Sequence, residues 1–108
     1  MIEIFVCDDD KNDLQTTAKL LEEIISEQKI SYRLHAFLSP EEMMKNMETI
    51  DIGILDIAMK ECNGIELGRR IREKFPEVKL IYTTGFEEYC MQAVNDVHAF
   101  SFLCKPIM

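Results

Sequence analysis

The residues Ile52-Gly53-Ile54-Leu55-Asp56 form a short apolar run that ends in a single carboxylate. A run of this length and composition fits a central parallel strand that is covered on both faces. In open α/β sheets, ligands bind just beyond the carboxyl ends of such strands. Asp56 is therefore the first candidate for a functional residue, and the rest of the chain can be searched for a matching sheet.

The chain alternates between strand-like and helix-like segments five times, and the last helix is absent. The expected strands cover residues 2–7, 31–37, 52–56, 78–84 and 98–104. The expected helices cover about residues 13–28, 40–47, 64–75 and 87–94. This alternation predicts one α/β domain over residues 1–108, with a parallel sheet and helices on both faces.

Several local details can be tested against a structure. Asn12 or Asp13 is expected to cap the first helix, and the three-four spacing of apolar residues predicts its buried face. The residues of that face are Leu14, Thr17, Ala18, Leu21, Ile24 and Ile25. Ser39 followed by Pro40 is a helix-start signal. His35 is expected to be an exposed strand residue and not a ligand, since the sequence shows no partner for it.

The composition excludes some classes of protein. The net charge is -8, from 12 basic and 20 acidic side chains, which argues against binding nucleic acid through the general surface. No apolar run approaches the length of a membrane span, and a cytoplasmic protein is expected. The cysteines are not paired at metal-ligand spacing, and three of them are expected to act as small hydrophobic residues. These three are Cys7, Cys90 and Cys104, whereas Cys62 falls in a loop.

Polar residues follow four of the five expected strands. Asp8 and Asp9 come after the first strand, Asp56 ends the third, Thr84 ends the fourth and Lys105 follows the fifth. Each residue alone has an ordinary structural explanation, as a turn, a cap or a solvated end. Because the carboxyl ends of parallel strands share one edge of the sheet, these side chains are expected to form one cluster.

The expected cluster combines three carboxylates with a hydroxyl and an ammonium group. The carboxylates repel one another unless a cation lies between them, and Mg²⁺ or Mn²⁺ fits better than zinc because no His or Cys takes part. Such a pocket is suited to hold a phosphoryl group while Asp56 attacks in line as the nucleophile. An acyl phosphate on Asp56 is the expected product.

At this point the chain resembles the receiver domain of two-component response regulators. The resemblance covers essentially the whole chain. It is carried by Phe5-Val6-Cys7-Asp8-Asp9-Asp10, Ile54-Leu55-Asp56-Ile57, Asn63-Gly64-Ile65-Glu66-Leu67, Thr84-Gly85 and Lys105-Pro106. It implies a flavodoxin-like, three-layer α/β fold with a five-stranded parallel sheet of order 2-1-3-4-5. It also implies a phosphoacceptor switch that receives its phosphoryl group from a histidine kinase, and not a turnover enzyme.

The resemblance implies a role for each residue of the acidic pocket. Asp56 matches the phosphoacceptor of the family. Asp9 matches a direct Mg²⁺ ligand, and Asp8 matches the acidic partner that acts largely through water. The backbone carbonyl of Ala58 matches the third protein ligand of the metal.

The resemblance also implies which residues change conformation after phosphorylation. Thr84 matches the hydroxyl that moves toward the phosphoryl group, and Lys105 matches the lysine that pairs with it. Phe102 matches the aromatic switch residue, which turns inward when Thr84 moves.

The segment from Ile81 to Tyr89, which reads Ile-Tyr-Thr-Thr-Gly-Phe-Glu-Glu-Tyr, is similar to receivers of the LytTR class. In that class the partner domain binds DNA and regulates transcription. The implied output is therefore transcription, through a DNA-binding domain that is absent from this sequence.

The chain departs from the family pattern in three places, of which one is the small residue Gly85 where the family commonly has alanine. Met59 is followed by Lys60 where the family usually has proline, so a looser loop beside the metal is expected. The sequence also stops at Met108, where a fifth helix is expected. A receiver truncated there exposes apolar residues of its fifth strand, which predicts dimerisation or other self-association.

Two other functions remain open on the sequence alone. A Mg²⁺-dependent phosphatase with an aspartyl-phosphate intermediate needs a general acid two residues past its nucleophile, and Ala58 occupies that position. A receiver-like module that binds proteins without phosphorylation would be favoured by a missing acceptor or lysine, and the sequence retains both.

Overall fold

The computed structural model describes residues 1–60, 63–84 and 101–104. Its strands are β1 (Ile2–Cys7), β2 (Tyr32–Phe37), β3 (Ile52–Asp56), β4 (Lys79–Thr84) and β5 (Ser101–Cys104). Its helices are α1 (Lys11–Glu27), α2 (Pro40–Lys45) and α3 (Gly64–Lys74). The helix expected near residues 87–94 and the beginning of the expected fifth strand lie outside the described residues. Within the described ranges, no helix has the length and apolar character that crossing a membrane requires.

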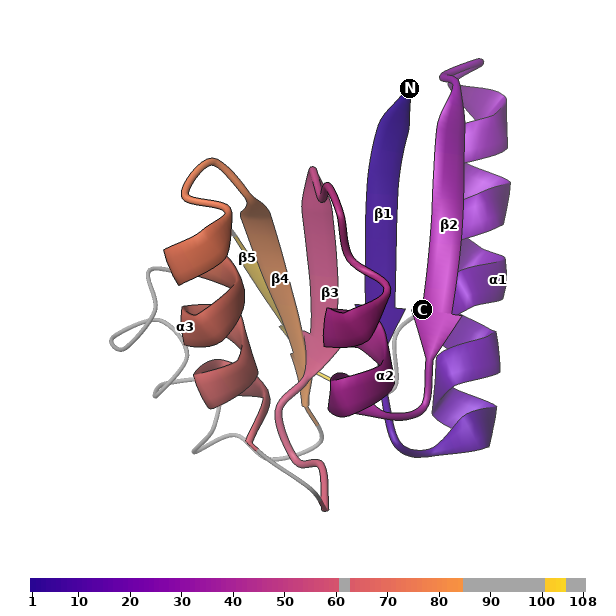
Figure 1. Ribbon diagram of the computed structural model, residues 1–108. Coiled ribbons are helices and arrows are strands. Elements are labelled where there is room, and N and C mark those ends of the chain that lie inside the picture. The colour runs from indigo at the N-terminus through magenta and orange to yellow at the C-terminus, as the bar shows by residue number, and fades with distance from the viewer. Residues whose placement is uncertain (61–62, 85–100, 105–108) are drawn as a thin grey trace.

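All five strands form one parallel sheet of order β2-β1-β3-β4-β5 (Figure 1). The flavodoxin-like order predicted from the sequence is confirmed. β3 lies at the centre of the sheet, between β1 and β4. The carboxyl end of β3 therefore has a neighbouring strand on each side, and residues beyond those three strand ends meet at one edge.

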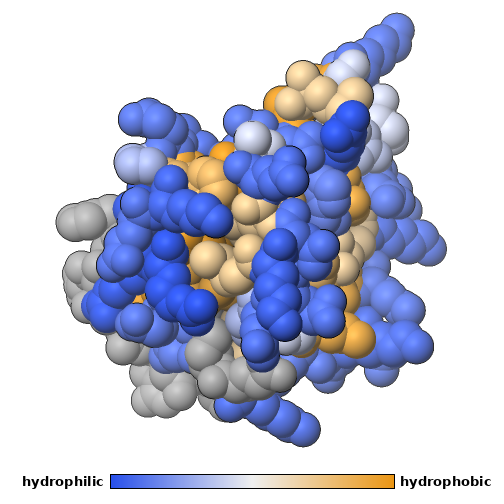
Figure 2. All heavy atoms as spheres, in the orientation of Figure 1, coloured by the Kyte–Doolittle hydropathy of each residue, from blue (hydrophilic) through white to orange (hydrophobic). Residues whose placement is uncertain are grey.

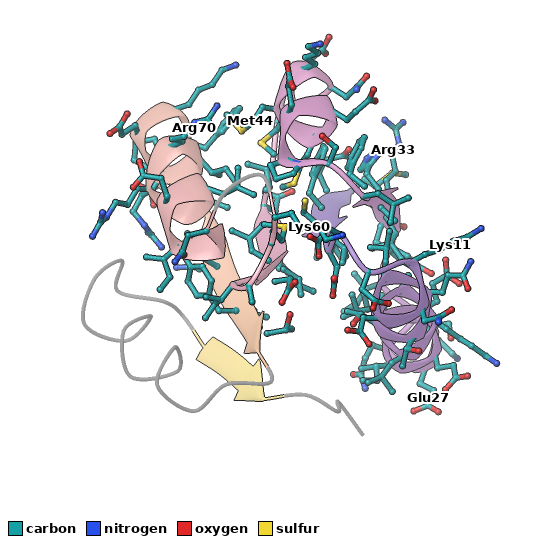
Figure 3. All side chains as sticks on the ribbon, turned by 90° about the horizontal axis from the view of Figure 1, so that it is seen from below. Lys11, Glu27, Arg33, Met44, Lys60 and Arg70 are labelled. Carbon is teal, nitrogen blue, oxygen red and sulfur yellow. The ribbon has the colours of Figure 1, made fainter. Side chains whose placement is uncertain are left out.

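Helices cover the sheet on both faces, with α1 on one side and α2 and α3 on the other (Figures 1 and 3). Alternate residues of β3 pack into two hydrophobic clusters, one on each face of the sheet. Leu55 packs in the larger cluster beneath α2 and α3, and Ile54 packs with Leu14 of α1. Figure 2 shows hydrophilic side chains over much of the face that carries α2 and α3, with hydrophobic ones visible between them. The prediction that β3 is buried on both sides is confirmed.

The predicted cap and buried face of α1 need correction. Asp10 caps the helix, because its side chain accepts a hydrogen bond from the Asp13 backbone N–H at 3.0 Å, and Asn12 and Asp13 lie within the first turn. Ile24 is 50% exposed, although it was predicted to face the core. A turn of about 100° per residue places Ile24 at the margin of the stripe that contains Leu14.

His35 lies in a strand as predicted, but it is partly buried and has a partner that the sequence did not show. Its Nε2 atom lies 3.0 Å from Glu3 Oε1, and its ring stacks on Phe5 with 4.5 Å between centroids. The parallel register pairs Phe5 with His35 and Glu3 with Arg33, so the histidine lies next to a carboxylate on the adjacent strand. The register of β1 against β2 brings Glu3 and His35 together, so the residues next to His35 in the sequence could not predict this pair.

Candidate functional site

The carboxyl ends of β1 and β3 bring three carboxylates together. Cys7 pairs with Leu55 in the register of these strands, so continuing by one residue places Asp8 beside Asp56. Asp8 is 2% exposed and Asp56 is 4% exposed, while Asp9 is half-buried. One carboxylate oxygen from each of Asp8, Asp9 and Asp56 lies within 4.8 Å of the others. The structure thus places these predicted site residues in one pocket.

Backbone N–H groups hold two of these carboxylates in place. Asp8 Oδ1 accepts a hydrogen bond from the Asp10 N–H at 2.9 Å. Asp9 Oδ2 accepts one from the Lys60 N–H at 2.8 Å. Hydrogen bonds of this kind are strengthened by the charge of the acceptor. Both donors lie in loops at the edge of the sheet, so the backbone itself helps to compensate the clustered negative charge.

The loop beside the pocket, where a looser path was expected, carries a contact from Lys60. Proline has no N–H, so the family's usual residue at this position could not donate this hydrogen bond. In this chain the loop after β3 is attached to the Asp9 carboxylate by an additional contact. Lys60 contacts the acidic pocket, and sequence reasoning missed this contact. The absent proline indicated that residue 60 has a free N–H donor, but its acceptor, Asp9, could not be identified without the fold.

The loop between β3 and α3 is closed by short-range contacts. The Gly64 N–H donates to the Ile57 carbonyl at 2.9 Å, and Ala58 and Asn63 pair as an isolated bridge. A Cβ atom on Gly64 would overlap the backbone carbonyl of Asp56, so the start of α3 can approach β3 only with glycine. Ala58, the expected source of a carbonyl ligand, is exposed in this loop.

β4 contributes hydroxyl residues to the same edge. Thr83 pairs with Asp56 in the β3–β4 register and is only 2% exposed. Thr84 follows as the last residue of β4 and pairs with Cys104 of β5. The backbone of Phe102 pairs with Tyr82, and Lys105 lies outside the described residues. The roles expected for Thr84, Phe102 and Lys105 therefore stay predictions.

The donor set of the acidic pocket fits a divalent cation that prefers oxygen ligands. Among the described residues, the one group of three or more metal-ligating side chains is this set of aspartates, with no His or Cys in it. Mg²⁺ and Mn²⁺ favour carboxylate, carbonyl and water oxygens. Buried carboxylates this close together repel one another, and a bound cation relieves that repulsion. The residues present therefore fit the expected metal.

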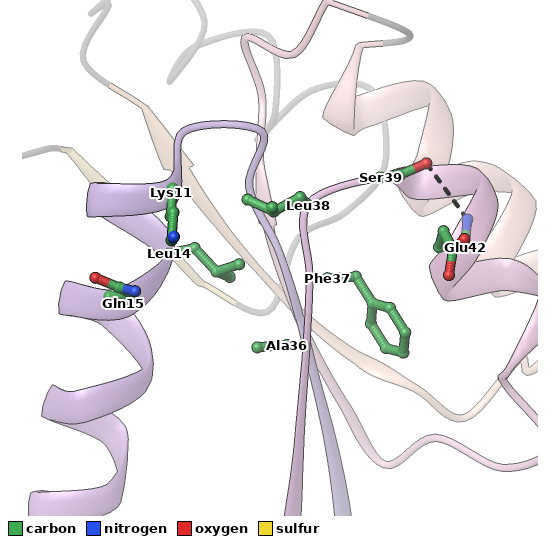
Figure 4. A pocket seen from close by; sticks show the side chains of 8 residues that line it. All are labelled: Lys11, Leu14, Gln15, Ala36, Phe37, Leu38, Ser39 and Glu42. Carbon is green, nitrogen blue, oxygen red and sulfur yellow. Dashed lines mark hydrogen bonds between the residues drawn. The ribbon is translucent and has the colours of Figure 1, made fainter.

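A groove of about 410 Å³ lies near this edge, between the first turns of α1 and α2 (Figure 4). Its lining combines apolar residues from the end of β2 with polar residues from the two helices. The lining residues are Lys11, Leu14, Gln15, Ala36, Phe37, Leu38, Ser39 and Glu42. None of the three clustered aspartates lines this groove, so it is separate from the acidic pocket.

A central parallel sheet with an acidic pocket beyond its middle strands is the arrangement that the sequence predicted for a phosphoacceptor domain. Residues 4–108 match the response regulator receiver domain family. The chain belongs to this family.

Solved structures agree with this assignment. The BeF3-activated receiver domain of DrrB, a Thermotoga maritima protein, is 27% identical with a TM-score of 0.84, over 100% of this chain and 87% of that one. The response regulator TrrA from Thermotoga maritima, solved in complex with Mg²⁺ and BeF, is 28% identical with a TM-score of 0.75. That match covers 99% of this chain and 89% of TrrA.

Among curated relatives, the sensory transduction protein LytT of Oceanobacillus iheyensis is 41% identical over 54 residues. The aligned part is 48% of this chain and 22% of LytT. The first curated relatives are all much longer, and the matched segments span 8% to 26% of their lengths. The name of this relative agrees with the LytTR class expected from residues 81–89.

Proposed function

We propose that this domain is a phosphoacceptor that a histidine kinase phosphorylates on Asp56. The observation that carries the proposal is the position of Asp56: it is buried, it ends the central strand, and it lies within 4.8 Å of two further carboxylates. Membership of the receiver family supports the same assignment. A buried carboxylate among like charges is an unfavourable arrangement for stability alone, which favours a functional reason for it.

Asp8, Asp9, Asp56 and the backbone carbonyl of Ala58 would hold Mg²⁺ or Mn²⁺. When bound, the cation supplies positive charge that neutralises the phosphoryl oxygens. Asp9 is half-buried and therefore accessible from solvent, whereas Asp8 is 2% exposed and acts from behind the pocket. This division agrees with a direct role for Asp9 and a water-mediated role for Asp8.

The proposed reaction transfers the phosphoryl group from a phosphohistidine of the kinase. A carboxylate oxygen of Asp56 attacks the phosphorus in line, the new O–P bond forms, and the P–N bond to the imidazole breaks. The bonding electrons leave with the imidazole nitrogen, which takes up a proton. Lys105 pairs with the transferred group, and the Thr84 hydroxyl donates a hydrogen bond to it.

The aspartyl phosphate then biases a two-state switch. Thr84 moves toward the phosphoryl group, and Phe102 turns inward as it does so. The pairing of the two strands supports this coupling, because β4 and β5 are adjacent and the backbone of Phe102 pairs with Tyr82, two residues before Thr84. The domain assists its own phosphorylation and dephosphorylation and acts as a switch.

The output that we propose is transcription, through a DNA-binding domain of the LytTR type. The support is the LytT relative, together with the residues at 81–89 that resemble this class. We also propose that the domain self-associates. The support is that Ile52 and Ile81 on the α1 face are only partly buried among the described residues, and exposed apolar surface favours association. Sedimentation that shows a monomer at every concentration would exclude self-association.

The phosphoacceptor proposal can be tested by intact-protein mass after incubation with acetyl phosphate, with and without Mg²⁺. The wild type should gain one phosphoryl group only with Mg²⁺, and Asp56→Asn should gain none. Asp51→Asn is a matched control, because Asp51 is an exposed aspartate just before the same strand. A folded wild-type protein that gains no phosphoryl group would favour a module that works unphosphorylated.

A further inference from the structure

The backbone N–H of Lys60 connects the loop after β3 to the acidic pocket. It donates to Asp9 Oδ2 at 2.8 Å, across a separation of 51 residues in the sequence. Figure 3 shows Lys60 at the centre of the carboxyl edge of the sheet, between α3 and α1. The geometry points to Lys60 as a positioning residue, whose N–H holds the Asp9 carboxylate in the orientation that receives a divalent cation. This inference rests on the cation site of the proposed function.

The residues just before Lys60 are held by contacts with the neighbouring strand and the core. The Ile57 N–H donates to the Thr83 carbonyl at 3.0 Å, and the Met59 N–H donates to the Ile57 carbonyl at 3.2 Å. The Met59 side chain is 9% exposed, and its sulfur lies 3.7 Å from the Cys7 sulfur in the core. Lys60 directly follows this anchored residue, so its N–H has a defined position before any ligand binds.

Asp9 is the member of the acidic pocket that most needs such a contact. Asp8 is 2% exposed and accepts a hydrogen bond from Asp10 within its own loop. Asp9 is half-buried, so solvent can stabilise other rotamers of its side chain. A carboxylate has about four lone-pair sites, so the Lys60 N–H occupies one and leaves capacity for a cation. Fixing the carboxylate in advance lowers the entropy lost when the metal binds.

The inference concerns the amide of residue 60 and not its side chain, which is exposed. Lys60→Pro removes the N–H, and Lys60→Ala removes the ammonium group but keeps the N–H. Because proline also restricts Met59, a third variant replaces the residue 60 amide by an ester. This protein can be assembled by ligation at Cys62, and it replaces the N–H donor by an oxygen while keeping the lysine side chain.

The readout is the dissociation constant of Mg²⁺, measured by titration calorimetry on variants whose fold is checked by circular dichroism. Loss of a hydrogen-bond partner of a metal ligand typically costs about 10–100-fold in metal affinity. We expect Lys60→Pro and the ester variant to bind Mg²⁺ about tenfold more weakly than the wild type. Lys60→Ala should bind as the wild type does, which would rule out an effect of the lysine charge.

Equal or tighter Mg²⁺ binding by the ester variant would overturn the inference, and this variant decides the matter if Lys60→Pro does not fold. A second measurement uses the wild type, in which the Lys60 amide proton should keep its downfield NMR shift when Mg²⁺ is added. Loss of that shift would mean that the cation displaces the Lys60 N–H from Asp9, and this result would also overturn the inference. A wild type that binds no Mg²⁺ would refute the cation site itself, so the two failures are distinguishable.

Discussion

The hydroxyl group of Tyr82 lies directly beneath Gly68, so that a Cβ atom at position 68 would overlap the hydroxyl oxygen. Tyr82 is fully buried in β4, and Gly68 lies in the middle of α3. The absence of a side chain at one residue therefore makes room for the polar end of the other. This contact sets how closely α3 approaches the strand that ends at Thr84.

Gly68→Ala should destabilise the protein. Alanine is the better helix former by about 1 kcal/mol, but overpacking against the rigid Tyr82 ring costs about 1–3 kcal/mol. The free energy of unfolding in urea should fall. It should recover in part in the double variant with Tyr82→Phe, which lacks the overlapping oxygen. Arg70→Ala, at an exposed position of the same helix, serves as the control. An increase in stability for Gly68→Ala alone would contradict the observed contact.

The Tyr82 hydroxyl also predicts a response to alkaline pH. Burial raises the pKa of Tyr82 well above its ordinary value, against a smaller opposite effect of Arg72 and Arg69. The unfolded chain ionises near its ordinary pKa of about 10, while the folded protein retains the proton. Stability is therefore fully present below about pH 10 and is lost as the pH rises above it.

Tyr82→Phe should remove part of this alkaline loss, as measured by urea unfolding between neutral and high pH. At neutral pH this variant should be at least as stable as the wild type, since the hydroxyl has no hydrogen-bond partner among the described residues. Tyr32→Phe, which removes a hydroxyl at a partly exposed tyrosine, is the matched control. Identical alkaline profiles for Tyr82→Phe and the wild type would show that Tyr82 does not cause the loss.

The acidic pocket predicts that Asp56→Asn stabilises the protein in the absence of metal and reduces the stabilisation that Mg²⁺ provides. Without divalent cations, Asp56→Asn should raise the free energy of unfolding by about 1–3 kcal/mol, because it removes one of three mutually repelling charges. With Mg²⁺ at about 100 times its dissociation constant, the wild type should gain about 2.7 kcal/mol and Asp56→Asn less. Thermal unfolding in EDTA and in Mg²⁺ measures both effects. If Mg²⁺ stabilised both proteins equally, Asp56 would not belong to the metal site.

The first turn of α1 provides a test of its cap. Asp10→Ala should lower the free energy of unfolding by about 1 kcal/mol, because the N–H of Asp13 loses its side-chain acceptor. Asn12→Ala should have little effect, since Asn12 is exposed within the first turn and its neighbour Asp10 provides the cap. Urea unfolding of the two variants distinguishes the observed cap from the one that the sequence suggested. A larger loss for Asn12→Ala would mean that the helix begins later.

Local signals were enough to predict most of the elements. The start of α2 at Ser39 and Pro40 and the strand that ends at Asp56 are visible in the sequence, because capping and burial are properties of neighbouring residues. The cap of α1 was misplaced because several consecutive residues there have side chains that can cap a helix. Local sequence offers no way to choose among Asp10, Asn12 and Asp13.

Long-range contacts were beyond prediction from the residues alone. The pairing of Glu3 with His35 depends on the register of two strands, and the contact between Lys60 and Asp9 depends on where two loops meet. Clustering of the aspartates could be predicted because it needs only parallel strands with a common direction. The donors that hold the aspartates could not be predicted, because that requires the path of each loop.

Asp8, Asp56 and Thr83 continue one row across β1, β3 and β4, and all three are buried. A misfolded chain with β1 shifted by one residue would move Asp8 away from Asp56 and turn the apolar side chains of β1 to the wrong faces. Correct assembly of the core and formation of the acidic pocket are thus inseparable outcomes of one pairing. A chain whose sheet assembled in the wrong register would therefore lack the acidic pocket as well as the native core.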